Sequence, residues 1–445
     1  MLELPYSKAR RYLTGIDWVI HTLNDMTMRA TGVGNSSQIV LEIDGIPPED
    51  ELRERLGAFI GKFPVLYGSL GRDAFNLAPY WKMPPLGWSP PPLPLTVHRL
   101  EEGADATAVH RLLEQAVNRP FGSPREHLAF HLVAVGKLSY LVFTFDHRLL
   151  DARGAEAFLG MFQEEWEGGE DRSDGISLTE PAHLDHWEEK FEAGRQLNRM
   201  LLCREKSTPP SSLPLPANLM GRGYRFRVIP FDEQQTAAID ENTNENAGFL
   251  MFMPYSLAAA ARAMHPVFTR RGMRSADDYI ISVSIDMRPH QKVERDLFFN
   301  HLSFLLFTMG KEEMESFPAL LDSIKRQMYE QVKSKFPQNL REVLHLTRIA
   351  PLPLMHTVMR LYFKGSLVSF SFSYVSESAY RPSSFMKERV KNIFHMPRVP
   401  APPGLGIFFT RFHGKLNAVL SSMDGLLRDD EADTILRGLR SSLGV

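Results

Sequence analysis

The sequence predicts a mixed α/β fold made of two halves that contain the same classes of element. Segments with the two-residue alternation of strands are interspersed with segments that have the spacing of amphipathic helices, along all 445 residues. One stretch, residues 207–223, is rich in Pro, Ser and Gly and has neither periodicity. We therefore predict an N-terminal lobe over residues 1–206, a linker over 207–223 and a C-terminal lobe over 224–445.

In the first half, the elements alternate from the start. Periodicity predicts a helix within 16–23, a strand at 38–43, a helix at 48–63 and a helix at 106–118. Proline-rich residues 84–94 are predicted to form an extended surface loop rather than an SH3 ligand. Strands at 128–135 and 138–145 are joined by Gly136 and Lys137, a connection typical of a tight hairpin. Helices at 155–166 and 184–204 complete this half.

The second half is expected to have a similar mixture. Predicted strands lie at 224–229, 279–287, 302–309 and 366–375, and a closing hairpin at 405–412 and 416–423. Predicted helices lie at 232–242, 250–268, 311–346 as one long helix, and 432–443.

The composition has no strong charge. Hydrophobic residues make up 43% of the chain and charged residues 23%, which suffices for two hydrophobic cores. The formal net charge of −2 creates no overall basic field, so nucleic acid is not expected as a partner.

Location is predicted from the N-terminus, the cysteine and the apolar stretches. The N-terminal residues lack the apolar core of a signal peptide, and the single cysteine, Cys203, cannot form an intramolecular disulfide. The apolar stretch 249–264 contains Pro254 and Arg262, which make it too polar and too short to span a bilayer. We expect a cytoplasmic protein without a transmembrane segment.

The most informative residues are His147 and Asp151, which follow the predicted strand at 138–145. Phe143, Phe145 and His147 share one face of that strand, whereas Asp146 points to the other face. Asp151 directly precedes a helical stripe, where a carboxylate can accept hydrogen bonds from the first helical amides. The order of strand, histidine, carboxylate and helix suits a general base with a fixed support.

Other candidates carry less information. His21 and Asp25 have the same spacing but lie beside the apolar stripe of a helix, so we interpret them as a solvated pair one turn apart. His183 and His186 have no third ligand at useful spacing, so no metal site is expected. Cys203 has no paired histidine signature and is interpreted as a partly buried helix residue.

Several segments, in order, resemble the CoA-dependent acyltransferase superfamily, which includes peptide condensation domains, chloramphenicol acetyltransferase and wax ester synthases. The resemblance is carried by the residues around the motif, namely Arg119-Pro120-Phe121, the hairpin and His147–Asp151. It is extended by Phe63–Leu66, by Val283–Pro289 with Asn300, and by Pro402–Gly406. Two positions depart from the common pattern: Asp146 stands where many members have a second histidine, and Ala152 where many have glycine.

The resemblance implies two pseudo-symmetric α/β lobes like those of chloramphenicol acetyltransferase, with an active-site channel between them. His147 would be the general base, and Asp151 would be structural, held by Arg288 at the end of a second-lobe strand. Ser369, Ser371 and Ser373 alternate with apolar residues, and family position suggests Ser373 as the oxyanion donor.

Three functions remain open from the sequence. The first is an acyltransferase that uses a CoA or carrier-protein thioester as substrate, with no bound cofactor or metal, and a hydroxyl or amine of a small molecule as acceptor. The second is a catalytically silent relative that binds a carrier protein or lipid, motivated by Asp146 and Ala152. The third is a stand-alone enzyme that forms an amide, with an acyl carrier protein supplied in trans.

Overall fold

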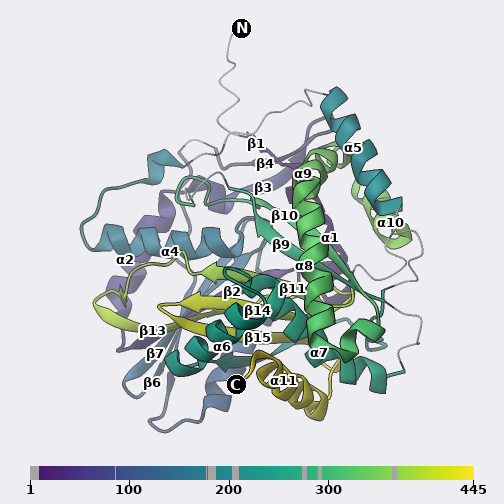
Figure 1. The fold of residues 1–445 in the computed structure, drawn as a ribbon. Helices are drawn as coiled ribbons and strands as arrows, with labels where there is room; N and C mark the ends of the chain where they lie inside the picture. Colours follow the sequence, from purple (N-terminus) through teal and green to yellow (C-terminus); the bar gives the residue numbers. More distant parts are fainter. Residues whose placement is uncertain are drawn as a thin grey trace.

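The computed structural model describes residues 10–85, 87–176, 178, 187–202, 210–272, 278–288, 293–362 and 368–445. Two six-stranded mixed sheets and a small three-stranded sheet are flanked by helices (Figure 1). The predicted α/β class is therefore confirmed. Cys203, Pro289, His183 and His186 lie outside the described residues.

The strands form three sheets. In the small sheet, the order is β1 (Arg10–Tyr12), β4 (Pro79–Lys82) and β3 (Ser69–Arg72). In the first large sheet, the order is β12 (Ser384–Phe385), β13 (Glu388–His395), β2 (Ser36–Asp44), β7 (Leu138–Asp146), β6 (Leu128–Val135) and β5 (Leu95–Leu100). In the second, it is β10 (Leu302–Met309), β9 (Tyr279–Asp286), β11 (Ser371–Glu377), β14 (Leu405–Phe412), β15 (Lys415–Met423) and β8 (Tyr224–Pro230).

Helices pack against both large sheets and against one another. Their bounds are α1 (Gly15–Thr31), α2 (Glu49–Gly61), α3 (Ala106–Asn118), α4 (Ala152–Trp166), α5 (Trp187–Leu202), α6 (Glu233–Asn246), α7 (Phe252–Arg270), α8 (Phe317–Lys333), α9 (Phe336–Thr347), α10 (Leu352–Tyr362) and α11 (Asp429–Leu443). None of these helices is both long enough and apolar enough to cross a membrane.

The first large sheet is fixed by aromatic packing against α4. Phe143 of β7 stacks on Phe130 of the neighbouring strand with 4.7 Å between ring centroids, and its other neighbour, Phe158, comes from α4. All three rings are fully buried. His147 follows the last residue of β7, so the turn that carries the histidine starts from a closely packed strand.

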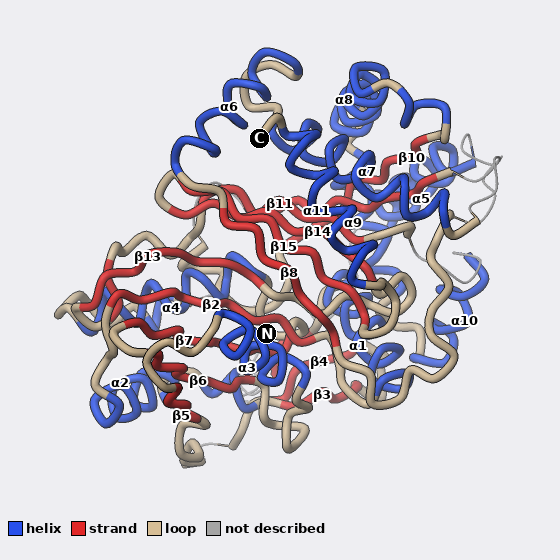
Figure 2. Tube along the Cα trace, turned by 90° about the horizontal axis from the view of Figure 1, so that it is seen from below, coloured by secondary structure: helices blue, strands red, loops and turns tan. Residues whose placement is uncertain are grey.

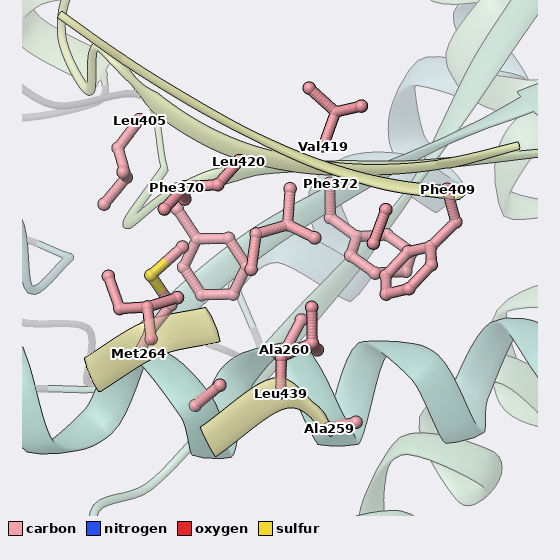
Figure 3. Packing of buried hydrophobic residues seen from close by; sticks show 14 of the residues in the cluster. Ala259, Ala260, Met264, Phe370, Phe372, Leu405, Phe409, Val419, Leu420 and Leu439 are labelled. Carbon is pink, nitrogen blue, oxygen red and sulfur yellow. The ribbon is translucent and has the colours of Figure 1, made fainter. Parts of the chain in front are cut away.

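The second large sheet packs on helices α7 and α11. Figure 3 shows Ala259 and Ala260 of α7 beneath Phe372 and Phe409 of the sheet, with Leu439 of α11 alongside. The two alanines are fully buried, and their small side chains let the helix approach the sheet closely. The sheet's other face is thereby left available to line an interior cavity.

Two strands from the second half of the chain, β12 and β13, join the first sheet. β13 pairs antiparallel with β2, and Figure 2 shows it at the border between the two large sheets. The sequence analysis predicted no strand there. Residues 210–223, the described part of the predicted linker, contain no helix or strand. The lobe boundaries at 206 and 224 stay a prediction, since the two sheets do not divide the chain at a single point.

The single long helix predicted at 311–346 is wrong. The segment contains a short 3₁₀ turn at Glu312–Glu315 and then two helices, α8 and α9. The break lies at Lys335, which has a left-handed φ of 54°, and Pro337 stands in the first turn of the next helix. A proline near a helix start is favourable, but the left-handed residue before it redirects the chain.

Candidate active site

His147 lies in the turn that follows β7. Its backbone N–H donates to the Asn35 carbonyl at 3.3 Å, and its own carbonyl accepts from Asn300 Nδ2 at 3.0 Å. One contact comes from the start of β2 and the other from the segment before β10. The backbone of His147 is therefore held by both halves of the chain.

The His147 ring lines a cavity of about 500 Å³ between the two large sheets. The first half contributes Asn35, Ser37, His147 and Asp151 to its wall, and the second half contributes residues of β9, β10, β11 and β14. The location matches the channel that the resemblance implied.

One nitrogen of the His147 ring is open. Nδ1 is buried and has no hydrogen-bond partner among the described residues, whereas Nε2 is neither buried nor hydrogen-bonded within them. In the neutral tautomer that carries its proton on Nδ1, the Nε2 lone pair has no competing protein group and can accept a proton, as a general base must.

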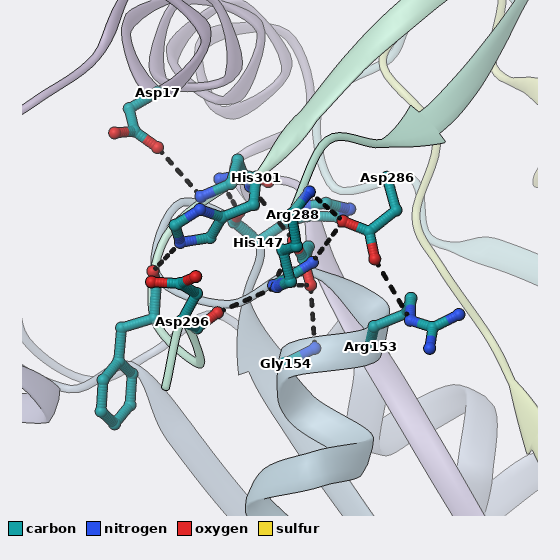
Figure 4. Close-up of polar contacts among 11 residues, drawn as sticks. Asp17, His147, Arg153, Gly154, Asp286, Arg288, Asp296 and His301 are labelled. Carbon is teal, nitrogen blue, oxygen red and sulfur yellow. Dashed lines mark hydrogen bonds and ion pairs between the residues drawn. The ribbon is translucent and has the colours of Figure 1, made fainter. Parts of the chain in front are cut away.

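Asp151 is the N-cap of α4, and its carboxylate is almost fully enclosed. Oδ1 accepts from the Gly154 N–H at 2.8 Å, and Oδ2 accepts from the His301 N–H at 3.2 Å. Arg288 Nη2 donates to both oxygens, at 2.9 and 2.8 Å (Figure 4). Each oxygen of the Asp151 carboxylate thus accepts two hydrogen bonds from protein donors. No lone pair is left to contact a substrate.

Arg288 joins the two sheets through this contact. Its Nη1 donates to Asp286 at 3.1 Å, and its Nε donates to the Asp296 carbonyl at 3.0 Å. Its side chain is only 3% exposed, and that of Asp151 8%. The structure therefore brings together the two residues that the resemblance had paired, although 137 positions separate them.

The environment lowers the pKa of Asp151. Burial alone would raise that pKa, but the Arg288 charge and the hydrogen bonds outweigh it. A carboxyl with a lowered folded-state pKa contributes stability above its unfolded pKa of about 3.9, and that contribution is lost as the pH falls through the folded value. We expect the thermal stability advantage of wild type over Asp151→Asn to be constant near neutral pH and to shrink below about pH 4. Melting temperatures of both proteins from neutral to acid pH check this; parallel curves would contradict it.

A second set of buried contacts supports Asn300, the residue that donates to the His147 carbonyl. The Asn300 N–H donates to Asp17 Oδ1 at 3.0 Å, and Asp17 pairs with Arg11 at 2.7 Å. Both side chains of this pair are at most 3% exposed. The sequence analysis noted Asn300 as a family position but assigned it no contact, and it missed Asp17, because neither residue is near the motif in sequence.

The carboxylate of Asp146 is held by residues other than His147. Its carboxylate accepts from His127 Nδ1 at 3.0 Å and from Arg148 Nε at 2.9 Å. Asp146 is 3% exposed, and its pKa is lowered because the Arg148 charge and these hydrogen bonds outweigh the effect of burial. Asp146, which stands where the resemblance implied a second histidine, is therefore engaged by its own neighbours.

Gly154, two residues after Ala152, lies in close contact with the backbone of another segment. A Cβ on Gly154 would lie 2.1 Å from the Leu297 carbonyl oxygen, which belongs to the segment that leads to Asn300. We expect Gly154→Ala to destabilise the protein by about 1–3 kcal/mol, because a backbone atom must move. Gly175→Ala is the matched control, since nothing lies within 4 Å of its Cβ position. Denaturant midpoints measure both; equal midpoints would refute the close approach.

Ser373 also reaches the cavity. Its Oγ accepts from Ser284 Oγ at 3.2 Å, and both residues line the cavity wall. Ser369, in contrast, is fully buried and accepts from the Ile280 N–H, so it has a structural role. Of the three alternating serines, Ser371 and Ser373 remain available to a ligand.

The second histidine–aspartate pair was misinterpreted. His21 is 7% exposed and stacks on Trp18, and burial lowers its pKa to about 4. Asp25 pairs instead with Arg29 and His356. His21 and Asp25 are therefore not a solvated pair. The buried face of α1 includes polar residues such as His21, and the spacing of apolar residues does not reveal these. Within the described parts of the chain, no cluster of His, Cys, Asp and Glu could hold a metal ion.

Solved structures share this fold over nearly the whole chain. The trichothecene 15-O-acetyltransferase from Fusarium sporotrichioides has a TM-score of 0.68 at 14% identity, over 98% of this chain and 95% of that one. The first condensation domain of the calcium-dependent antibiotic synthetase, in complex with a substrate analogue, has a TM-score of 0.69 at 13% identity, over 98% and 96%. The EpoB cyclization-docking bidomain from Sorangium cellulosum has a TM-score of 0.63 at 14% identity, over 100% and 87%.

Sequence comparison gives no match of this kind. No protein-family model matches the chain, and no curated protein matches it. At such low identity the structures establish the fold and not the reaction. The chain has the two-lobed fold of condensation domains and of this acetyltransferase, as the resemblance implied.

Proposed function

We propose that the protein is an acyltransferase that moves an acyl group from a CoA or carrier-protein thioester to a hydroxyl or amine. The observation that carries the proposal is the open Nε2 of His147 in a cavity that both sheets line. The likeness to an acetyltransferase and to condensation domains supports acyl transfer in general.

In the proposed reaction, His147 Nε2 takes the proton from the acceptor O–H or N–H while the heteroatom bonds to the thioester carbonyl carbon. The carbonyl oxygen becomes an oxyanion, and the Ser373 hydroxyl is the proposed donor to it. Collapse of this intermediate breaks the C–S bond, and the proton returns to the leaving sulfur. The products are an ester or amide and a free thiol, so no covalent enzyme intermediate is required.

Asp151 and Arg288 would act as positioning residues. The carboxylate is saturated by Gly154, Arg288 and His301, so it has no capacity left to exchange a proton with substrate. Its proposed part is to fix the start of α4 relative to β9 and thereby the turn that carries His147.

The test is release of free thiol from short-chain and long-chain acyl-CoA in the presence of alcohol and amine acceptors. Mass spectrometry of the products separates ester formation from amide formation. A protein that releases thiol no faster than His147→Ala with every donor would be catalytically silent with these donors. Binding of an acyl carrier protein or lipid would then be the function to pursue, which is the second hypothesis from the sequence.

A further inference from the structure

Four serines form a hydroxyl-bearing wall on one side of the cavity. We call this group the serine wall; its members are Ser282 and Ser284 of β9 and Ser371 and Ser373 of β11. All four are half-buried, and each lines the cavity.

The arrangement follows from strand alternation in the sheet interior. β9 and β11 are parallel neighbours, and Phe372 is level with Val283. Because these two apolar residues point to the α7 side, the serines on either side of them point to the cavity. Hydroxyls are then spaced by roughly 7 Å along each strand and about 5 Å across the pair.

Serine is an unusual choice for this position in terms of stability. Interior strands favour β-branched and aromatic residues, which pack on a pleated surface. The same two strands do carry such residues on their other face, where Ile281, Val283 and Phe372 are almost fully buried. A wall of hydroxyls that face inward therefore has no explanation in the packing of the sheet.

Protein groups do not use all of these hydroxyls. Ser284 donates to Ser373. Ser282 and Ser371 have no side-chain hydrogen-bond partner within the described parts of the chain. A hydroxyl donates one hydrogen bond and accepts two, so the wall offers both kinds of contact to a ligand.

A second, independent observation concerns three other residues that line the same cavity. Each carries a buried polar atom that lacks a partner within the described residues: Asn35 Oδ1, His395 Nδ1 and Thr410 Oγ1. Thr410 lies on β14, the strand next to the serine wall, and His395 lies at the end of β13. Buried polar groups without partners are rare in folded proteins, and three of them beside one cavity indicate that ordered water or a polar ligand belongs in this region.

We propose that the serine wall binds a neutral, hydrogen-bonding segment of a substrate, one that carries amide or hydroxyl groups, in preference to an unbroken alkyl chain. That the bound molecule is a substrate rests on the proposed function, whereas the binding itself does not. Apolar residues such as Leu23, Met253 and Phe304 line other parts of the cavity, so the ligand has an apolar portion as well.

The test compares binding of matched probes by calorimetry. The probes are 1,6-hexanediol, N-acetylcysteamine and, as the apolar reference, 1-hexanol. Wild type is expected to bind at least one polar probe about fivefold more tightly than 1-hexanol, the effect of roughly one net hydrogen bond. In Ser282→Val/Ser371→Val the preference is expected to disappear, because valine suits a strand but offers no hydroxyl.

A matched serine variant outside the cavity serves as the control. Ser69→Val, a half-buried strand serine in the small sheet, is the matched control and should behave as wild type. Ser282→Ala/Ser371→Ala replaces the valine variant if the latter does not fold. Preference for N-acetylcysteamine would assign the wall to the thioester side, and preference for the diol to the acceptor side.

The proposal is overturned if wild type has no preference for either polar probe, or if the preference persists in the double variant; the wall is then merely hydrated. Neither result depends on turnover. Failure of His147-dependent thiol release would therefore remove the proposed function without deciding this one.

Discussion

His147→Ala is expected to lower the rate of acyl transfer by about 10²–10⁴-fold, the range that a positioned general base contributes. The physical reason is that the Nε2 of His147, in the cavity wall, has no hydrogen-bond partner within the described residues and so is free to accept the proton. The side chain makes no hydrogen bond within the described residues, so the free energy of unfolding should change by no more than about 1 kcal/mol. Thiol release and thermal melting of the same preparations measure the two quantities.

His98→Ala is the matched control for this prediction. His98 is a half-buried histidine on β5, where it stacks on His131 and takes no part in the cavity. Its loss should leave the rate unchanged. A rate that is equal in wild type and His147→Ala would exclude His147 as the base, whereas a parallel loss in both variants would indicate a general effect on the fold.

The local part of the site could be predicted from the sequence because it depends on short-range rules. Strand alternation placed His147 on the face of Phe143 and Phe145. In the structure Phe143 packs on Phe158 of α4, whereas His147 lies in the turn after the strand and lines the cavity, so the shared face stays a prediction. The position of Asp151 directly before an apolar helical stripe indicated the N-cap that the structure contains. Both inferences use residues within ten positions of each other.

Contacts between distant segments could not be predicted in this way. The pairing of Asp151 with Arg288 came from the resemblance alone, since no periodicity connects residues so far apart. Strand β13 was not predicted because a bulge between Val390 and Asn392 shifts the register. The alternation of apolar residues is therefore broken in the middle of the strand. The helix break at Lys335 was not predicted because the apolar spacing typical of a helix continues on both sides of it. Pro337 was a usable signal for the start of a new helix.

Arg288→Met is expected to destabilise the protein by about 3–5 kcal/mol, because it leaves the Asp151 carboxylate buried without its counter-ion. Most of that loss comes from the unpaired charge rather than from the lost contact, and this makes a second substitution informative. Asn at position 151 can still cap α4 but carries no charge, so Asp151→Asn/Arg288→Met should be more stable than Arg288→Met alone. Urea midpoints of the two single variants and the double variant check this order.

Activity separates stability from positioning in the same set of variants. The double variant recovers stability but not the bond that joins α4 to β9, so its rate of acyl transfer should stay well below that of wild type. The ring of His147 is untouched in all of these variants, so a loss of rate must arise from the placement of its turn. A double variant that is stable and fully active would show that the turn is held well enough by Asn300 and by the backbone contact with Asn35, and that the Asp151–Arg288 pair serves the fold alone.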